Sequence, residues 1–69
     1  MSLTEDLADE LALKALAAAE KEDSTQVVDQ IAEILGASSQ TLQEAFLTAV
    51  RVRRAEARAR SVLAQHGIT

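Results

Sequence analysis

Apolar side chains in the first third of the chain recur every three or four residues, which places them on one side of a helix at about 100° per residue. This stripe consists of Leu7, Leu11, Ala15, Ala18 and Ala19. Ser2 and Glu5 precede it at the spacing of a capping box, which satisfies the free amide groups at a helix start. The pattern therefore predicts a first helix over about residues 3–21, buried along this stripe.

A second apolar face follows a short polar segment, residues 22–24. Its members occupy the i, i+1, i+4, i+7 and i+8 positions of a helix, and they are Val27, Val28, Ile31, Ile34 and Leu35. Asp23 stands three residues before Gln26, a spacing that favours Asp23 as the N-cap of this helix. Gly36 follows the face directly, and glycine readily adopts the left-handed conformation that ends a helix. We predict a second helix over about residues 24–35.

The longest predicted helix occupies most of the remaining chain. A serine of the Ser38-Ser39 pair supplies its N-cap, and no helix breaker follows until Gly67. A helix over residues 39–65 is about 40 Å long. Its core-facing positions are Leu42, Ala45, Phe46 and Ala49. The chain has no proline and much alanine and leucine, so we expect a single all-α domain over residues 1–69, a three-helix bundle with a long third helix.

This third helix carries a second stripe of small residues with the alternating three- and four-residue spacing of a coiled-coil seam. The stripe consists of Ala45, Thr48, Val52, Ala55, Ala59, Val62 and His66. A chain of 69 residues buries only about 60% of its unfolded surface, so a partner subunit is a common source of further stability. We expect a homodimer whose seam is formed by Val52, Ala55, Ala59 and Val62. The alternative is that the stripe packs on the first helix of the same chain.

Composition and charge narrow the function. The chain has no cysteine, begins with acidic residues and contains no long apolar run, so we expect a cytoplasmic protein with no membrane partner. The net charge of −4 hides an asymmetry, because acidic residues dominate up to Ile34 and arginines dominate from Leu35 onward. Such a split suits a nucleic-acid surface, an acidic partner, or pairing between the two halves.

The sequence predicts no catalytic site. His66 is the only histidine and stands beside the C-terminal glycine, where it caps or complements the end of a helix. Asp6, Asp9 and Glu10 lack the glycine-containing loop of a calcium site. No glycine-rich phosphate loop is present, and neither Ser38 nor Ser39 has a base nearby in sequence. We therefore expect a non-enzymatic protein without metal, cofactor or small-molecule substrate.

One segment resembles the core of a helix-turn-helix DNA-binding motif. Ala32, Gly36 and Ser38 match the small residue at the helix crossing, the turn glycine and the cap of that superfamily, and the flanking aliphatics match at Ile31, Leu35 and Leu42. The resemblance covers about residues 28–49 and identifies no particular family. It implies that the third helix enters a DNA groove.

At 100° per residue, one outer side of that helix presents polar and basic residues, namely Gln40, Gln43, Arg51, Arg54 and Arg58, together with Leu47. Glutamine pairs with an adenine edge, and arginine pairs with guanine or phosphate. The leading prediction is accordingly a small DNA-binding, transcription-regulating protein.

Two other binding functions remain open. In the first, the chain is a protein-interaction module that docks through the long third helix, with the arginines against an acidic protein surface and Leu13, Val52 and Val62 as apolar anchors. In the second, it is an acidic inhibitor that imitates nucleic acid through residues of the first helix, namely Glu5, Asp6, Asp9 and Glu10. These four are also favourable at the positive end of a helix dipole.

Overall fold

The computed structural model describes residues 2–69 and confirms an all-α three-helix bundle. The helices are α1 (Leu3–Glu22), α2 (Gln26–Ser38) and α3 (Gln40–Gln65), and α3 is the longest, as predicted. They pack against one another in all three pairs. No helix within residues 2–69 combines the length and the apolar character needed to cross a membrane.

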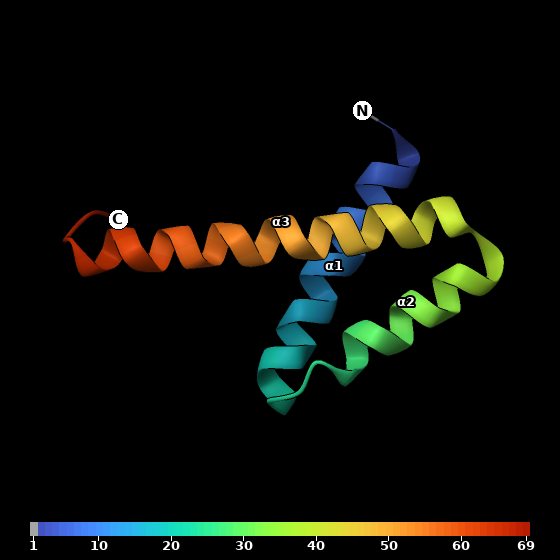
Figure 1. Cartoon of the computed structure of the whole chain (residues 1–69), viewed down its shortest axis with the longest axis horizontal. Coiled ribbons are helices and arrows are strands. Elements are labelled where there is room, and N and C mark those ends of the chain that lie inside the picture. Colours follow the sequence, from blue (N-terminus) through green and yellow to red (C-terminus); the bar gives the residue numbers. More distant parts are fainter. Residues whose placement is uncertain (1) are drawn as a thin grey trace.

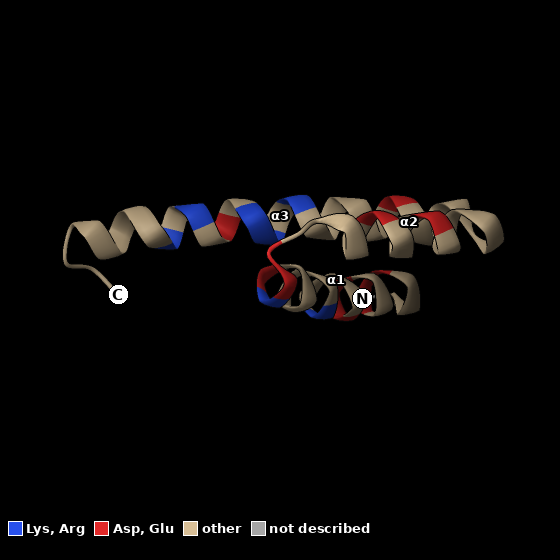
Figure 2. Cartoon of the chain, turned by 90° about the horizontal axis from the view of Figure 1, so that it is seen from below, with Lys and Arg blue, Asp and Glu red and all other residues tan. Residues whose placement is uncertain are grey.

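The three helices form a flat, two-layered molecule. α2 and α3 lie side by side as the two arms of a V, and α1 crosses beneath α3 (Figures 1 and 2). The Cα atoms span 44 × 30 × 13 Å. The second half of α3 extends past both other helices and ends at the C-terminus, far from the V-shaped junction (Figure 1). α1 therefore covers only the first half of α3.

The two serine caps form as predicted, whereas the Asp23 cap does not. The Ser2 hydroxyl accepts from the Glu5 amide at 3.1 Å, and the Ser39 hydroxyl accepts from the Leu42 amide at 3.2 Å. Asp23 ends α1 instead of starting α2, because it adopts the left-handed conformation with φ 53°. Aspartate tolerates this conformation better than most residues. The N-cap of α2 is Thr25.

The prediction that Gly36 ends the second helix is wrong. α2 continues through Gly36 to Ser38, and the single extended residue Ser39 joins it to α3. A Cβ atom at position 36 would overlap the side-chain amide of Gln43. That amide donates to the Ala32 carbonyl at 2.8 Å. The glycine thus permits close approach of the Gln43 side chain to α2, and its conformation stays helical.

The core is small and built largely from alanine. Its buried members are Ala8, Ala12, Ala15, Val28, Ala32, Phe46 and Val50. Phe46 is the one large side chain among residues 2–69 that is fully buried. The predicted stripe on α1 is rotated, because Leu7 remains 39% exposed while Ala8 and Ala12 are buried. Small alanines allow α1 to cross close beneath α3, and its leucines are left at the margins of the contact.

Candidate interaction surface on the third helix

The second half of α3 has almost no contact with the rest of the chain. From Ala57 to the C-terminus every residue is exposed, yet the helix continues to Gln65. The four residues of the predicted seam are all exposed, and Val52 and Val62 retain 60% and 53% of their surface. The four seam residues are therefore not buried against α1 of the same chain, whereas Ala45 at the start of the stripe packs against the core.

Three arginines form what we call the arginine strip, Arg51, Arg54 and Arg58. Arg51 and Arg58 are exposed and Arg54 is half-buried. Within residues 2–69 none of the three makes an ion pair or a side-chain hydrogen bond. Their guanidinium groups are consequently available to a partner.

The two glutamines predicted to share this surface behave differently. Gln40 is exposed, and its amide lies 3.5 Å from the Glu44 carboxylate on the same helix. Gln43 is half-buried and turned toward α2, where it bonds to the Ala32 carbonyl. Gln40 is therefore accessible to a partner along with the arginine strip, whereas the Gln43 side chain is engaged by α2.

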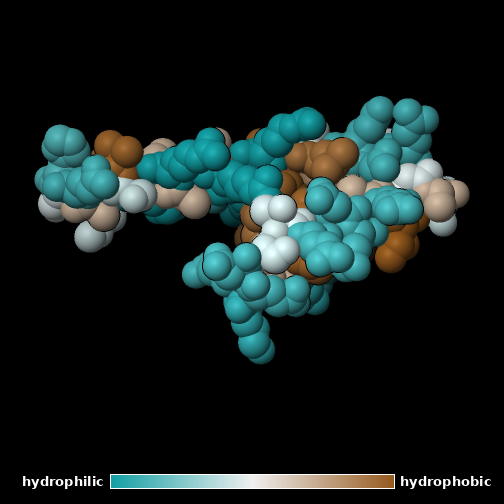
Figure 3. Space-filling view, turned by 60° about the horizontal axis from the view of Figure 1, so that its bottom comes forward, coloured by the Kyte–Doolittle hydropathy of each residue, from teal (hydrophilic) through white to brown (hydrophobic). Residues whose placement is uncertain are grey.

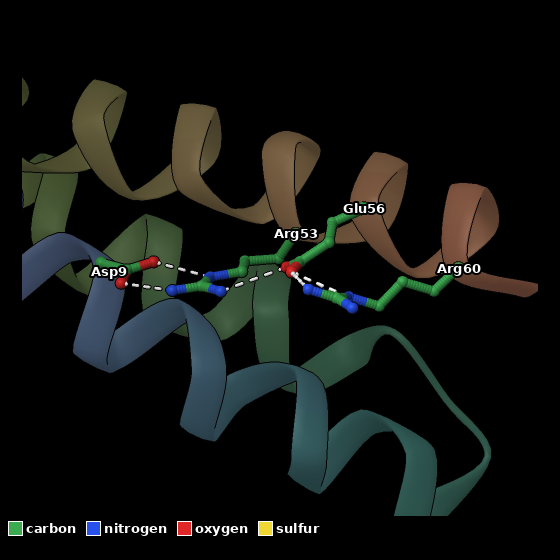
Figure 4. Close-up of polar contacts among 4 residues, drawn as sticks. All are labelled: Asp9, Arg53, Glu56 and Arg60. Atoms are coloured by element: carbon green, nitrogen blue, oxygen red, sulfur yellow. Dashed lines mark hydrogen bonds and ion pairs between the residues drawn. The ribbon is translucent and has the colours of Figure 1, made fainter. Parts of the chain in front are cut away.

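The neighbouring Arg53 is engaged inside the molecule. Its Nε and Nη2 atoms donate to the two Asp9 carboxylate oxygens at 2.9 and 2.7 Å, a bidentate pair between α3 and α1 (Figure 4). Its Nη1 atom donates to Glu56 at 3.1 Å, and Glu56 also accepts from Arg60 at 3.1 Å. This network ties α3 to α1 where α3 leaves the bundle.

Protonation equilibria follow these contacts. The hydrogen bonds from Arg53 hold the pKa of the Asp9 carboxyl below its usual value, partly opposed by desolvation. Hydrogen bonds from Arg60 and then Arg53 lower the pKa of Glu56. The same Asp9 and Glu56 contacts raise the pKa of Arg53. The network is thus fully charged at neutral pH. Sequence spacing suggests the Arg53–Glu56–Arg60 pairs, but it carries no signal for Asp9, which is 44 residues away from Arg53.

A shallow groove borders the seam. It has a volume of about 280 Å³ and is lined by Glu5 of α1 and by α3 residues Ala45, Thr48, Ala49 and Val52. Figure 3 shows that one face of the molecule is largely hydrophilic, with separate apolar areas that include one near the C-terminal end of α3. Apolar surface is therefore found both beside the bundle and near the far end of α3 (Figure 3).

Charge is distributed as the sequence predicts. Basic residues gather along the middle and second half of α3, while acidic residues predominate on α1 and α2 (Figure 2). Within residues 2–69 no group of three or more histidine, cysteine or carboxylate side chains is placed to hold a metal ion. His66 lies at the C-cap of α3, where its backbone amide donates to the Leu63 carbonyl at 3.0 Å.

Comparisons of the chain with family models, with curated proteins and with solved structures found no match.

Proposed function

We propose that this chain is a non-enzymatic binding protein that contacts an acidic surface of another protein through the arginine strip on α3. The observation that carries the proposal is that α3 stays helical from Ala57 to Gln65, where every residue is exposed. Isolated helices of fewer than about 12–15 residues are marginal in water. A helix end that is this exposed gains most from contact with another molecule.

The chemistry of the strip defines the class of partner. Arginine is the preferred side chain for ion pairs at interfaces, because its planar guanidinium can bind a carboxylate in a bidentate manner and is less strongly hydrated than an ammonium group. Arg53 already makes such a pair with Asp9 inside the molecule. Arg51, Arg54 and Arg58 offer the same chemistry outward. Complementary charge of this kind also accelerates association.

Three features favour a protein partner over duplex DNA. The Gln43 side chain is hydrogen-bonded to the Ala32 carbonyl of α2 and is therefore not free to contact a base. A single residue, Ser39, separates α2 from α3, whereas the turn of a helix-turn-helix motif has three or four residues. The chain carries a net charge of −4, with carboxylates concentrated on α1 and α2. A long polyanion such as DNA is repelled by the negative charge of the whole molecule. A local acidic patch on a protein interacts mainly with the arginine strip.

DNA binding with a role in transcription regulation is the second candidate. It is favoured by the three arginines without intrachain partners and by the Ala32, Gly36 and Ser38 resemblance described above. In this alternative Gln40 contacts base edges, and the arginine strip contacts phosphates or guanine.

Fluorescence anisotropy with two labelled probes distinguishes these functions. One probe is a glutamate-rich peptide and the other is a generic DNA duplex, each titrated at low and at higher salt. We expect the peptide to bind, and we expect R51Q/R54Q/R58Q to weaken it at least about tenfold, or about 1.4 kcal/mol. The control K14Q/K21Q removes two exposed positive charges on α1 and should have little effect.

Other outcomes decide against the leading proposal. Binding to the duplex alone, with a log–log salt slope near −0.9 per phosphate contacted, supports the second candidate. Absence of binding to either probe at low salt removes the arginine strip as an anion-binding surface.

A further inference from the structure

A second surface of α3, adjacent to the arginine strip, is left without a partner. The α3 seam, Val52, Ala55, Ala59 and Val62, is exposed along its whole length. Leu63 beside it is 47% exposed and Ile68 is 56% exposed. The fully buried core of a protein interface is more apolar than its rim.

The total surface of the chain indicates how much is left to cover. The accessible area is 5215 Å² for a mass of 7.4 kDa. A compact monomer of this mass has about 4,200 Å² by the size scaling of folded proteins. The excess is about 1,000 Å², and a standard interface buries about 800 Å² on each partner. The surplus belongs to the whole extended chain, and it is large enough to include one partner's share of a standard interface.

The order of residues in the seam is the same in both chain directions. Reading forward or backward gives valine, alanine three residues on, alanine four residues on, and valine three residues on. Two antiparallel copies centred on residue 57 therefore place Val52 against Val62 of the other copy, and Ala55 against Ala59. A two-fold axis requires this kind of self-complementary surface. The central alanines allow the two helices to approach closely.

The same register brings the end of α3 to the groove beside Glu5. Leu63 of one copy then lies near Ala49 and Val52 of the other, which line that groove. His66 lies near Thr48 of the other copy, at the edge where Glu5 is placed. The groove thus continues the seam, and the end of one copy's α3 reaches residues that line the groove of the other.

Charge also favours the antiparallel arrangement. From residue 53 onward the chain carries four arginines and one glutamate, whereas the preceding part is strongly acidic. Antiparallel copies separate the two acidic bundles, and in both the antiparallel and the parallel arrangement the basic halves of the two α3 helices lie against each other. A parallel pair brings the two acidic bundles together.

We infer that the α3 seam is covered by a second copy of this chain, antiparallel about a two-fold axis near residue 57. Because the seam and the arginine strip are different residues, this dimer does not depend on the proposed function. It does extend that function, since a two-fold axis places both strips on the same side of the helix pair. Two copies of Arg51, Arg54 and Arg58 then form one continuous basic band.

Sedimentation equilibrium measures the first part of this inference. At about 100 µM, a concentration at which a micromolar complex is almost fully formed, we expect twice the mass of 7.4 kDa. The variant V52E/V62E should sediment at the single-chain mass and keep its folded core, since both valines are exposed, and any loss of helical circular dichroism should be confined to what residues 57–65 contribute. Ile34 is 68% exposed on α2, so the control Ile34→Glu should remain dimeric. A single-chain mass for the unaltered protein, or a dimer that survives V52E/V62E, overturns the inference.

Disulfide trapping tests whether the two α3 helices of the dimer are antiparallel or parallel. Because the sequence contains no cysteine, no native thiol competes with the introduced pair. Chains with Val52→Cys and chains with Val62→Cys, carrying different tags, are mixed and oxidised. The antiparallel dimer predicts a cross-linked product that contains both tags, with little from either chain alone. Products that each contain one tag only would indicate parallel copies and overturn the register. Loss of peptide binding with an intact dimer would instead count against the proposed function.

Discussion

Replacing Gly36 with alanine should change stability by an amount that depends on Gln43. Gly36 lies inside α2, where alanine is favoured over glycine by about 1 kcal/mol. The new methyl group, however, occupies the position of the Gln43 amide and displaces it from the Ala32 carbonyl. A hydrogen bond of this kind contributes about 1 kcal/mol. The two effects have opposite signs and similar size.

A double-mutant cycle separates them. In the unaltered background we expect Gly36→Ala to change the free energy of unfolding by less than about 0.5 kcal/mol, because the helix gain offsets the lost hydrogen bond. In the Gln43→Ala background the space is open, and the same substitution should stabilise by about 1 kcal/mol. The coupling energy is therefore about 1 kcal/mol.

Thermal melts followed by circular dichroism provide the assay, at one protein concentration because association also raises the melting temperature. For a domain of this size, 1 kcal/mol corresponds to about 4–8 °C. The control Ala37→Gly lies next in the helix and is exposed, so its cost should be the same in both backgrounds. Equal effects of Gly36→Ala with and without Gln43 would refute the close-packing account. A loss of about 1 kcal/mol or more in both backgrounds would instead indicate a left-handed glycine.

Two further predictions concern the ends and the charges of the helices. Ser39→Ala removes the hydroxyl that caps α3 and should lower the free energy of unfolding by about 1 kcal/mol, measured as a lower melting temperature. The control Ser38→Ala at an exposed position should lower it by less than about 0.5 kcal/mol. Equal effects would contradict the cap. Because the folded-state pKa of Asp9 is lowered, its stabilising contribution is present above the unfolded value of about 3.9 and is lost as pH falls through the lower folded value. Melts between about pH 5 and pH 2 should therefore show a smaller loss of stability for Asp9→Asn than for the unaltered chain, and parallel profiles would argue against the Asp9–Arg53 pair.

Helix positions were predictable because their signals are local. Ser2 with Glu5 and Ser39 ahead of an unbroken run specify two helix starts within a few residues. The long α3 also follows from the sequence alone, since no breaker precedes Gly67. The all-α bundle required only these starts, the apolar spacing and the absence of proline.

The errors arise where a residue's role depends on a distant one. Gly36 has the sequence context of a helix stop. Its role is different, because the Gln43 side chain of the next helix occupies the space that a Cβ atom at position 36 would take. On α1, alanine and leucine are spread around most of the helix, so periodicity could not show that Ala8 and Ala12 would be buried. The Asp9–Arg53 pair joins positions that only the folded structure brings together.

Amide hydrogen exchange tests most directly whether the second half of α3 is a surface that awaits a partner. The comparison is between the amides of residues 57–65 and those of Phe46 and Val50 in the same helix, first in the V52E/V62E variant and then in concentrated unaltered protein. We predict that residues 57–65 of the variant exchange at least about a hundredfold faster than the two core amides, and that concentrated unaltered protein slows them. If these amides are as protected in a sedimentation-verified monomer without ligand as those of Phe46, the helix needs no partner and the central claim is contradicted.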